Sequence, residues 1–250
     1  MPDVENFKKY FKRTSLNKKI AEVECSAKEL IKNIGFGEFR KKLLGRKFKE
    51  AWRRGKFLIV EIAGIPEKLI IHFGMTGDLH YVKQGAEKTG EDRFTRLAIK
   101  FSNGYELRWL NQRKLGKIYL VKEPSEVELL REMGPEPLGM KQKEFLGLLE
   151  KYQDKNIKAF FLDQTIIAGI GNIYSDEILF RAGVHPFKPA NTLQEEELKK
   201  IYRNIKSVLK KAIELGGESI SDYRRPDGRE GEFDKERKVY RREGMPCYST

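Results

Sequence analysis

The sequence predicts an α+β protein: an N-terminal antiparallel β-sandwich with a flanking N-terminal helix, followed by a mostly helical C-terminal domain. Three features predict it: short β-like runs separated by turns, a Pro/Gly-rich segment over Met133–Gly139, and helical periodicity beyond that segment. A chain of 250 residues has room for two modest domains. We expect an N-terminal domain over residues 1–130, a helical domain over residues 131–220 and a tail over residues 221–250.

The expected strands alternate with turn residues in the first half of the chain. They are Phe57–Ile62, Leu69–Phe73, Leu97–Phe101 and Lys117–Val121. Asn103-Gly104 is a strong signal for a hairpin turn. An amphipathic helix is expected before them over Asp3–Arg13, with Phe7, Tyr10 and Phe11 on one face. The pattern is typical of an antiparallel sandwich or barrel.

Four helices are expected in the second half. They are Gln142–Tyr152, Ile157–Leu162, Ile173–Ala182 and Leu193–Leu215. Thr192 is the expected N-cap of the last helix, with Glu195 at capping-box spacing, and Gly216-Gly217 ends it.

Positive charge points to a polyanionic partner. Lys and Arg number 50 against 37 Asp and Glu, a formal net charge of +13. Two segments, Asn6–Lys19 and Glu38–Phe57, are strongly basic. One such run is as consistent with a solvated helix face as with a nucleic-acid patch, but two runs in one basic chain favour nucleic acid.

Membrane and secreted classes are not favoured by the sequence. Wholly apolar runs are only a few residues long, and the N-terminus reaches Lys8 without an apolar segment of signal-peptide type. Cys25 and Cys247, the two cysteines, lie far apart and form neither a secreted disulfide framework nor a four-cysteine zinc site. We expect a soluble, cytoplasmic protein.

Asp163–Glu177 is the segment richest in chemical information. An apolar helix end leads into a turn with Gly169 and Gly171, and a new helix begins at Asn172. Backbone N–H groups at such a turn and helix N-terminus can bind a phosphate. By spacing alone, two glycines that merely allow a tight turn explain the pattern equally well.

The wider segment Phe161–Pro186 closely resembles the helix-two-turn-helix signature of the formamidopyrimidine-DNA glycosylase / endonuclease VIII (Fpg/Nei) family. Further blocks resemble that family in the same order: Arg54–Leu58, His72–Gly77, Leu110–Gly116, Gly134–Leu138 and Asp222–Cys247. They span nearly the whole chain. The resemblance implies a bifunctional enzyme, monomeric, that acts on double-stranded DNA with an oxidised base or an abasic site and then nicks the strand.

The resemblance implies an N-terminal amine as nucleophile. Once Met1 is removed, Pro2 offers a secondary α-amine, and α-amines titrate near pH 8, so a useful fraction is neutral. Attack on the deoxyribose C1′ gives a Schiff base, which permits β- and then δ-elimination. An ordinary N-terminal residue is the default interpretation of Met-Pro, which the downstream motifs overturn.

The resemblance also implies roles for other positions. Lys56 matches the family's catalytic lysine, and Met75, Arg113 and Leu115 match the residues that fill the void left by an extruded nucleotide. Leu115 replaces a more common aromatic. The expected phosphate contacts are Lys158, Asn172, Tyr240 and, through its flanking backbone, His72, whereas Glu177 is expected to orient this region or the ribose. Tyr223 and Arg224 match the loop that binds the damaged base.

The chain departs from the family's pattern at its start. The family opens Met-Pro-Glu-Leu-Pro-Glu-Val-Glu, three residues longer than the opening here. With the gap after Pro2, Asp3 stands where a catalytic Glu should act; with the gap before it, the nucleophile and acid are absent. Glu5 is then a candidate for the remaining acid.

A second departure lies near the C-terminus. The family's pattern continues into a four-cysteine zinc finger, of which Cys247 is the single matching cysteine. One thiolate cannot hold tetrahedral zinc, so the finger is truncated or missing and we expect no bound metal or other cofactor.

Three functions remain as alternatives. The leading one is a DNA glycosylase/AP lyase for oxidised purines (8-oxoguanine and formamidopyrimidines), because the segment after Asp222 resembles the formamidopyrimidine branch. The second is a catalytically inactive damaged-DNA-binding protein of the same fold. The third is a ribosome-associated RNA-binding protein, against which the void-filling residues argue.

Overall fold

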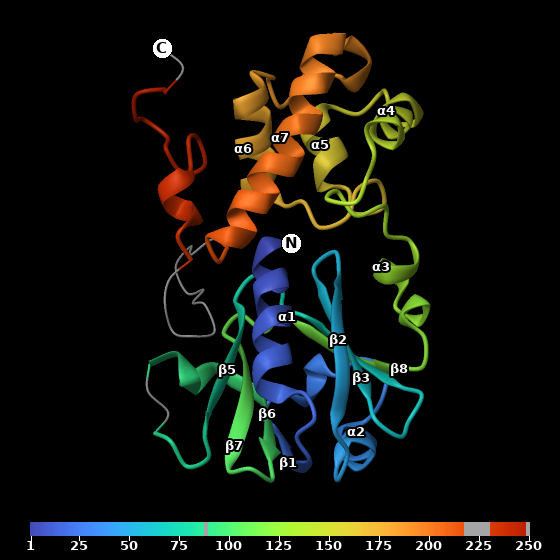
Figure 1. Cartoon of the computed structure of the whole chain (residues 1–250), viewed down its shortest axis with the longest axis vertical. Coiled ribbons are helices and arrows are strands. Elements are labelled where there is room, and N and C mark those ends of the chain that lie inside the picture. The colour runs from blue at the N-terminus through green and yellow to red at the C-terminus, as the bar shows by residue number, and fades with distance from the viewer. Residues whose placement is uncertain (88–89, 218–230, 249–250) are drawn as a thin grey trace.

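The computed structural model describes residues 1–87, 90–217 and 231–248. It has two parts that meet near the N-terminus of the chain (Figure 1). One part is built from β-strands and the other from helices, and the described C-terminal segment runs beside the helical part (Figure 1). The predicted α+β architecture is therefore confirmed.

Two four-stranded antiparallel sheets form the sandwich. The first has the order β1-β6-β7-β5, with β1 Ile20–Cys25, β5 Gly77–Lys83, β6 Thr95–Phe101 and β7 Tyr105–Asn111. The second has the order β2-β3-β4-β8, with β2 Phe48–Arg54, β3 Phe57–Ile62, β4 Lys68–His72 and β8 Lys117–Val121. The hairpin predicted at Asn103-Gly104 joins β6 to β7, where Gly104 has a φ of 83°.

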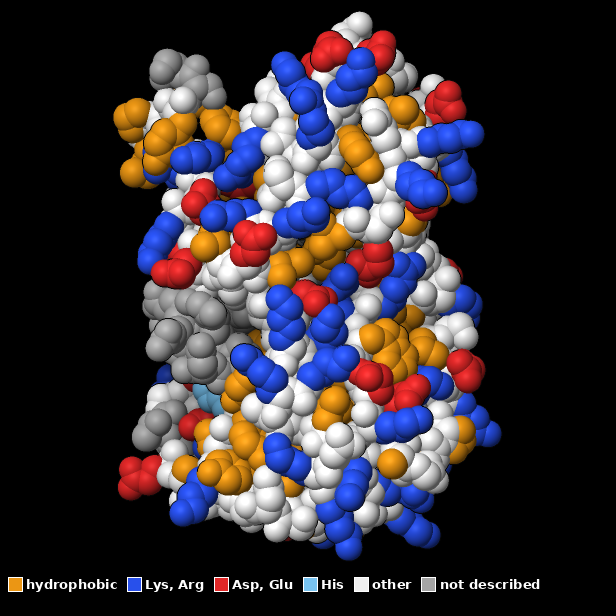
Figure 2. Space-filling model, in the orientation of Figure 1, with side chains coloured by type: hydrophobic (Ala, Val, Ile, Leu, Met, Phe, Trp, Pro, Cys, Tyr) orange, Lys and Arg blue, Asp and Glu red, His pale blue; other side chains and the backbone are white. Residues whose placement is uncertain are grey.

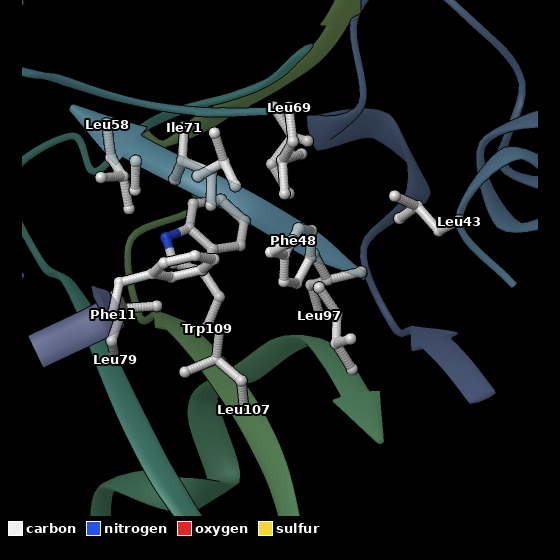
Figure 3. Close-up of a cluster of buried hydrophobic side chains, with 14 of the residues drawn as sticks. Phe11, Leu43, Phe48, Leu58, Leu69, Ile71, Leu79, Leu97, Leu107 and Trp109 are labelled. Atoms are coloured by element: carbon white, nitrogen blue, oxygen red, sulfur yellow. The ribbon is translucent and has the colours of Figure 1, made fainter. Parts of the chain in front are cut away.

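The helix α1, Pro2–Ser15, packs against the sandwich with its apolar face. Phe7, Tyr10 and Phe11 are buried, as its periodicity predicts. Figure 3 shows Phe11 beside Trp109 and Leu79, within an apolar cluster to which strands of both sheets contribute side chains. Acidic residues in the first turn of α1 and basic residues in its last turn suit the helix dipole. A short α2, Phe36–Leu43, precedes β2.

The helical part contains α3 Glu128–Arg131, α4 Gln142–Lys151, α5 Ile157–Leu162, α6 Asn172–Ala182 and α7 Glu195–Glu214. Short 3-10 turns lie at Lys28–Leu30, Gly90–Phe94, Pro124–Glu126, Ala190–Thr192 and Phe233–Glu236. The expected N-cap at Thr192 is wrong: Gln194 caps α7, and Glu197 completes its capping box. A 3-10 turn ends at Thr192, and Leu193, buried in the core, and Gln194 are extended, so the helix begins only at Glu195.

Each half has its own apolar cluster, and a third lies where they meet. This third cluster includes Phe57 and Ile70 of the sandwich, Leu130 and Met133 of the connecting segment, and Ala168 of the turn before α6. The head of α1 reaches the helical part as well, since Met1 packs in the helical core. The turns that carry the candidate site are thereby held between two packed bodies. Among the described helices, none has the length and apolar character needed to span a membrane.

Candidate active site and nucleic-acid interface

The turn between α5 and α6 is fixed by one side chain. The Gln164 amide accepts a hydrogen bond from Gly169 N (2.9 Å) and donates one to Ile170 O (2.9 Å). Gly169 has a φ of 81°, which favours glycine, and Gly171 is the N-cap of α6. The N-terminus of α6 is therefore presented in one rigid orientation. It forms part of the wall of a cavity described below.

Lys56 lies at the tip of the β2–β3 hairpin, and the connecting segment clamps that tip. Gly55, with a φ of 56°, donates its N–H to Glu136 Oε1 at 2.6 Å. Arg53 binds both carboxylate oxygens of Glu136, at 3.0 and 2.7 Å, and donates to Gly55 O at 2.9 Å. Met133 fills the space beside Gly55, where a Cβ would lie 2.5 Å from its sulfur. A larger residue at position 55 would have to displace the Met133 side chain and adopt a left-handed backbone conformation.

The Lys56 ammonium faces the turn before α6. A Cβ built on Gly171 would lie 3.3 Å from Nζ, so glycine leaves room for the lysine. Burial lowers the pKa of Lys56, and the Asp3 carboxylate partly offsets this effect. Lys56 lines two neighbouring cavities, which places its amine where a ligand can reach it.

The three predicted void-filling residues come together on two loops. Met75 follows β4, and Arg113 and Leu115 follow β7; Arg113 Nη1 lies 3.4 Å from the Met75 sulfur. Met75 is 72% exposed and Leu115 45% exposed, which is unusual for apolar side chains of this size. The loops touch through their backbones at Gly74, where a Cβ would lie 2.8 Å from the Leu115 carbonyl carbon.

A buried amide links these loops. Asn111, fully buried at the end of β7, donates to Phe73 O (2.8 Å) and accepts from Gly116 N (3.3 Å). Losing it would leave buried backbone groups without partners. Asn111 therefore holds Met75 and Leu115 at a fixed spacing.

His72 lies at the end of β4 against Phe57, with ring centroids 4.7 Å apart. Burial, with further contributions from Lys56 and Lys117, lowers the pKa of His72 to about 4. Its Nδ1 accepts a hydrogen bond from Gly74 N at 3.3 Å. The imidazole is thus neutral near pH 7 and cannot contribute a positive charge to phosphate binding there.

Two of the three catalytic candidates at the start of α1, Asp3 and Glu5, lie in different surroundings. Asp3 lines a cavity, and Tyr174 donates to its Oδ1 at 3.4 Å. Glu5 instead pairs with Arg53 (3.1 Å) and Lys8, which keeps its pKa low despite partial burial. Glu5 therefore supports the hairpin clamp and does not line either cavity around Lys56.

Pro2 is buried as the first residue of α1, and its nitrogen is part of the Met1–Pro2 peptide bond. The Met1 α-amine donates to Gly169 O at 3.0 Å, and burial lowers its pKa to about 5. Pro2 lines neither cavity around Lys56. Its two neighbours in sequence, Met1 and Asp3, both line the cavity of Lys56 and Asp3.

The phosphate-contact candidates of the helical half surround another cavity, of about 1030 Å³. Lys158 of α5, Asn172 at the start of α6 and Tyr240 of the C-terminal segment line it. Lys158 pairs with Asp176 at 2.7 Å. Phosphate binding there would have to compete with this ion pair.

Glu177 fixes the C-terminal segment against α6. Its carboxylate is fully buried and accepts from the backbone N–H groups of Lys238, Val239 and Tyr240 at 2.9–3.1 Å. Arg181 supplies a further bond at 2.6 Å. Glu177 thus positions the backbone at Tyr240, and its role towards DNA stays a prediction.

Six of the predicted residues converge on one cavity of about 430 Å³. They are Asp3, Lys56, Met75, Arg113, Asn172 and Tyr240, and they come from both halves of the chain. A second cavity of about 350 Å³ shares Lys56 and Met75 with it and adds His72 and Leu115. Tyr223 and Arg224 lie outside the described residues.

Sequence reasoning missed Arg53, Asn111 and Glu136. Glu136 had one available signal, since it is the acidic residue inside a Pro/Gly-rich segment. Asn111, directly after the apolar pair Trp109-Leu110, had another. Neither signal predicts which residue the side chain contacts in the folded protein.

Lys and Arg side chains are numerous on the face shown in Figure 2, and they gather over α1 and β2. This agrees with the two basic runs of the sequence, which supply α1 and the β2–β3 hairpin. Such a surface attracts a polyanion.

Comparison with known proteins decides the family. The model for the formamidopyrimidine-DNA glycosylase N-terminal domain matches residues 1–118, and that for the formamidopyrimidine-DNA glycosylase H2TH domain matches residues 133–224. The formamidopyrimidine-DNA glycosylase of Thermus thermophilus is 38% identical over 99% of this chain and 88% of its own length. That of Desulfitobacterium hafniense is 37% identical over 99% and 90%.

The chain belongs to the formamidopyrimidine-DNA glycosylase family. This confirms the resemblance and the expectation of a DNA glycosylase of base excision repair. Solved members of the formamidopyrimidine-DNA glycosylase family share the fold. Lactococcus lactis Fpg in complex with abasic-site DNA has a TM-score of 0.87 at 32% identity, covering 99% of this chain and 90% of that one. MutM in complex with DNA containing carbocyclic 8-oxo-G has a TM-score of 0.87 at 33% identity, with the same coverage.

The zinc finger of formamidopyrimidine-DNA glycosylases does not fit the residues of this chain. Cys247 is exposed, and Cys25 lies in β1 of the sandwich. Within the described ranges, the one group of three potential metal-binding side chains, Asp78, His80 and Glu91, contains no cysteine. A tetrahedral four-cysteine site cannot be assembled here. That the chain binds no metal stays a prediction.

Proposed function

We propose that this chain is a bifunctional DNA glycosylase and AP lyase that removes oxidised purines, 8-oxoguanine and formamidopyrimidines, from double-stranded DNA. It acts as a monomer on DNA in the cytoplasm. The observation that carries the proposal is the cavity where six side chains from both halves meet, one of which, Met75, is exposed and apolar. An enzyme that works on a base must take it out of the stack, which requires a pocket for the base and a filler for the gap.

The loops after β4 and β7 suit the filling role. Met75 and Leu115 are exposed apolar side chains, and Arg113 beside Met75 adds hydrogen-bond donors. An apolar wedge replaces lost stacking, and a cation can pair with the unpaired base opposite. Because Asn111 fixes the spacing of the two loops, Met75 and Leu115 are already positioned in the free protein.

The cavity itself suits the chemistry of the sugar. Asp3 and Lys56 line it together, so a carboxylate and an amine are available at one place. An amine attacks C1′ as the glycosidic bond breaks and the base leaves. The resulting Schiff base makes the C2′ proton acidic, which permits β- and then δ-elimination. The expected nucleophile is the Pro2 nitrogen, which becomes a secondary amine once Met1 is removed.

The DNA bound in solved relatives supports the substrate class. Lactococcus lactis Fpg has been crystallised with DNA that contains an abasic site and with DNA that contains N7-benzyl-Fapy-dG. MutM has been crystallised with carbocyclic 8-oxo-G DNA. The basic face of this chain suits the same kind of ligand.

The test is strand cleavage of an end-labelled duplex with one 8-oxoguanine opposite cytosine. Matched duplexes carry 5-hydroxycytosine, an abasic site or no damage. We expect cleavage of the 8-oxoguanine and abasic duplexes, with the shorter δ-product present. Cleavage of the 5-hydroxycytosine duplex alone would overturn the purine specificity. Cleavage of the abasic duplex alone would overturn the glycosylase activity.

The inactive damaged-DNA-binding protein would behave differently. It would bind the abasic duplex in preference to undamaged DNA and leave every strand intact. The relatives named above are all glycosylases, so this alternative gains no support from them. A ribosome-associated RNA-binding protein would instead prefer structured RNA in a competition assay.

A further inference from the structure

Three residues border both the cavity with Lys56 and the larger cavity with Lys158. They are Asn172, Tyr240 and Arg241. Asn172 is the first residue of α6, and the other two belong to the C-terminal segment. The resemblance predicts phosphate contacts at Asn172 and Tyr240 and assigns nothing to Arg241. Among the described residues, Arg241 is therefore the one cation on the rim that these two cavities share.

Two neighbouring basic side chains already have partners. Lys158 pairs with Asp176 at 2.7 Å, and the Arg242 guanidinium lies over the Tyr248 ring, 4.2 Å from its centroid. Arg241, in contrast, is exposed and has no hydrogen bond or ion pair with any residue that the structure describes. An unpaired guanidinium can bind a phosphate without first leaving another acceptor. Arg241 is thus the most available cation at the rim.

The backbone of Arg241 is in the left-handed region, with a φ of 57°. This conformation is disfavoured for residues with a Cβ, whereas glycine adopts it readily. The backbone just before it is fixed, because Glu177 accepts three consecutive N–H groups that end at that of Tyr240. The fold therefore keeps an arginine in a conformation that costs stability. Such backbone outliers cluster at binding sites.

We infer that Arg241 is a further phosphate-binding residue of the DNA interface, and that its guanidinium contacts one backbone phosphate where the strand crosses the shared rim. The inference deepens the proposed function and rests on it. A guanidinium can donate two parallel N–H bonds to one phosphate, whereas an ammonium acts as a point charge. Because phosphates carry no base information, Arg241 adds affinity for DNA and no preference for a damaged base.

The test measures the affinity of the full-length chain for two duplexes over a series of KCl concentrations. One duplex has a non-cleavable tetrahydrofuran site and the other is undamaged. The variants are Arg241→Gly, which suits the backbone, and Arg241→Lys, which keeps the charge. Arg203→Ala is the matched control, because it removes the same charge from an exposed position of α7 that lines neither cavity. Thermal unfolding and cleavage of an abasic duplex are measured for each protein.

We expect Arg241→Gly to bind both duplexes about tenfold more weakly at low salt, because one charge-assisted contact is lost. The slope of the logarithm of affinity against the logarithm of salt concentration should become shallower by about 0.9, the value for one phosphate. The melting temperature should nonetheless rise by roughly 2–4 °C, because glycine relieves the left-handed backbone. Arg241→Lys should keep the slope of the parent, and Arg203→Ala should bind like the parent.

Unchanged affinity and salt slope in Arg241→Gly, with the abasic duplex still cleaved by the parent, would overturn the inference and leave the proposed function intact. An equal loss of affinity in Arg203→Ala would also overturn it, because net charge would then account for the effect. A lower melting temperature of Arg241→Gly would assign Arg241 a structural role instead. A parent chain that leaves the abasic duplex intact would overturn the proposed lyase, whatever the salt slopes are.

Discussion

The buried carboxylate of Glu177 accepts the backbone N–H of Tyr240 at 3.1 Å, across 63 residues of sequence. It accepts two neighbouring N–H groups as well, so one side chain of α6 sets the path of the C-terminal segment. Tyr240 borders both the cavity with Lys56 and the cavity with Lys158. The two cavities thus share a wall that depends on Glu177.

Replacing Glu177 should therefore affect stability and DNA binding together. Glu177→Ala leaves three backbone N–H groups without their acceptor and removes the charged partner of Arg181. Breaking a buried pair of this kind costs about 3–5 kcal/mol. Urea unfolding measures this cost, and affinity for abasic-site DNA should fall as well. Glu214→Ala, at an exposed position of α7, is the control and should change neither quantity. Unaltered unfolding of Glu177→Ala would contradict the positioning role.

The contacts of Glu136 with Arg53 and Gly55 at the tip of the β2–β3 hairpin should affect the cleavage rate more than DNA affinity. Glu136→Gln keeps the size of the side chain but removes the charge that binds Arg53 at two points. Charge-assisted hydrogen bonds contribute about 1.5–3 kcal/mol each, so the Gly55-Lys56 turn should loosen. We expect the single-turnover cleavage rate to fall at least tenfold, with DNA affinity within about threefold. Equal losses of rate and affinity would indicate a general loss of structure instead.

A double-mutant cycle isolates that contact. Arg53→Ala and Glu136→Gln should each slow cleavage, and the double variant should be no slower than the worse single one, because both act on the same turn. Additive losses would place the two residues in separate roles.

The wedge residues should matter for base extrusion and little for folding. Met75→Ala shortens a side chain that is 72% exposed, so its thermal unfolding should be within error of the parent. Shortening the apolar wedge removes roughly 1.5–3 kcal/mol of apolar burial against the neighbouring bases, so excision of 8-oxoguanine should slow about tenfold. Cleavage of a preformed abasic site should slow less, since no base must be extruded. Leu146→Ala, an exposed leucine of α4, is the control.

The contributions of His72 and His80 to folding stability should change with pH in opposite directions. Burial lowers the pKa of His72 to about 4, whereas the ion pairs with Asp78 and Asp92 outweigh burial and raise the pKa of His80 above 6.5. Between about pH 4 and 6.5, the His72 imidazole binds more protons in the unfolded chain than in the folded one. Its contribution to the free energy of unfolding therefore falls as pH drops through this window. His80 favours the folded state below pH 6.5 and loses that contribution as pH rises through its folded pKa.

Imidazole NMR titration checks both histidines directly. Urea unfolding checks the linkage: His72→Gln should gain stability relative to the parent at pH 5, and His80→Gln should lose more at pH 5.5 than at pH 8.5. A His72 that titrates near pH 6.5 would contradict its burial against Phe57.

The sequence by itself determined the strands Phe57–Ile62 and Lys117–Val121, the burial of one face of α1 and the turn before Asn172. These features depend on local periodicity and turn chemistry, which neighbouring residues encode. The blocks around Lys56, His72 and Arg113 also sufficed to place the chain in its family, because their residue types and order are specific. The cap of α7 was misplaced because capping signals at Thr192 and Gln194 lie only two residues apart.

Only the tertiary structure decided which polar residues meet. Glu5 turned out to pair with Arg53, 48 residues away, and Arg53 with Glu136, 83 residues away. It also placed the Pro2 nitrogen beside the cavity that Asp3 and Lys56 line. No local pattern specifies such partners, because they are brought together only when the apolar faces of the two halves are buried and the connecting segment closes between them.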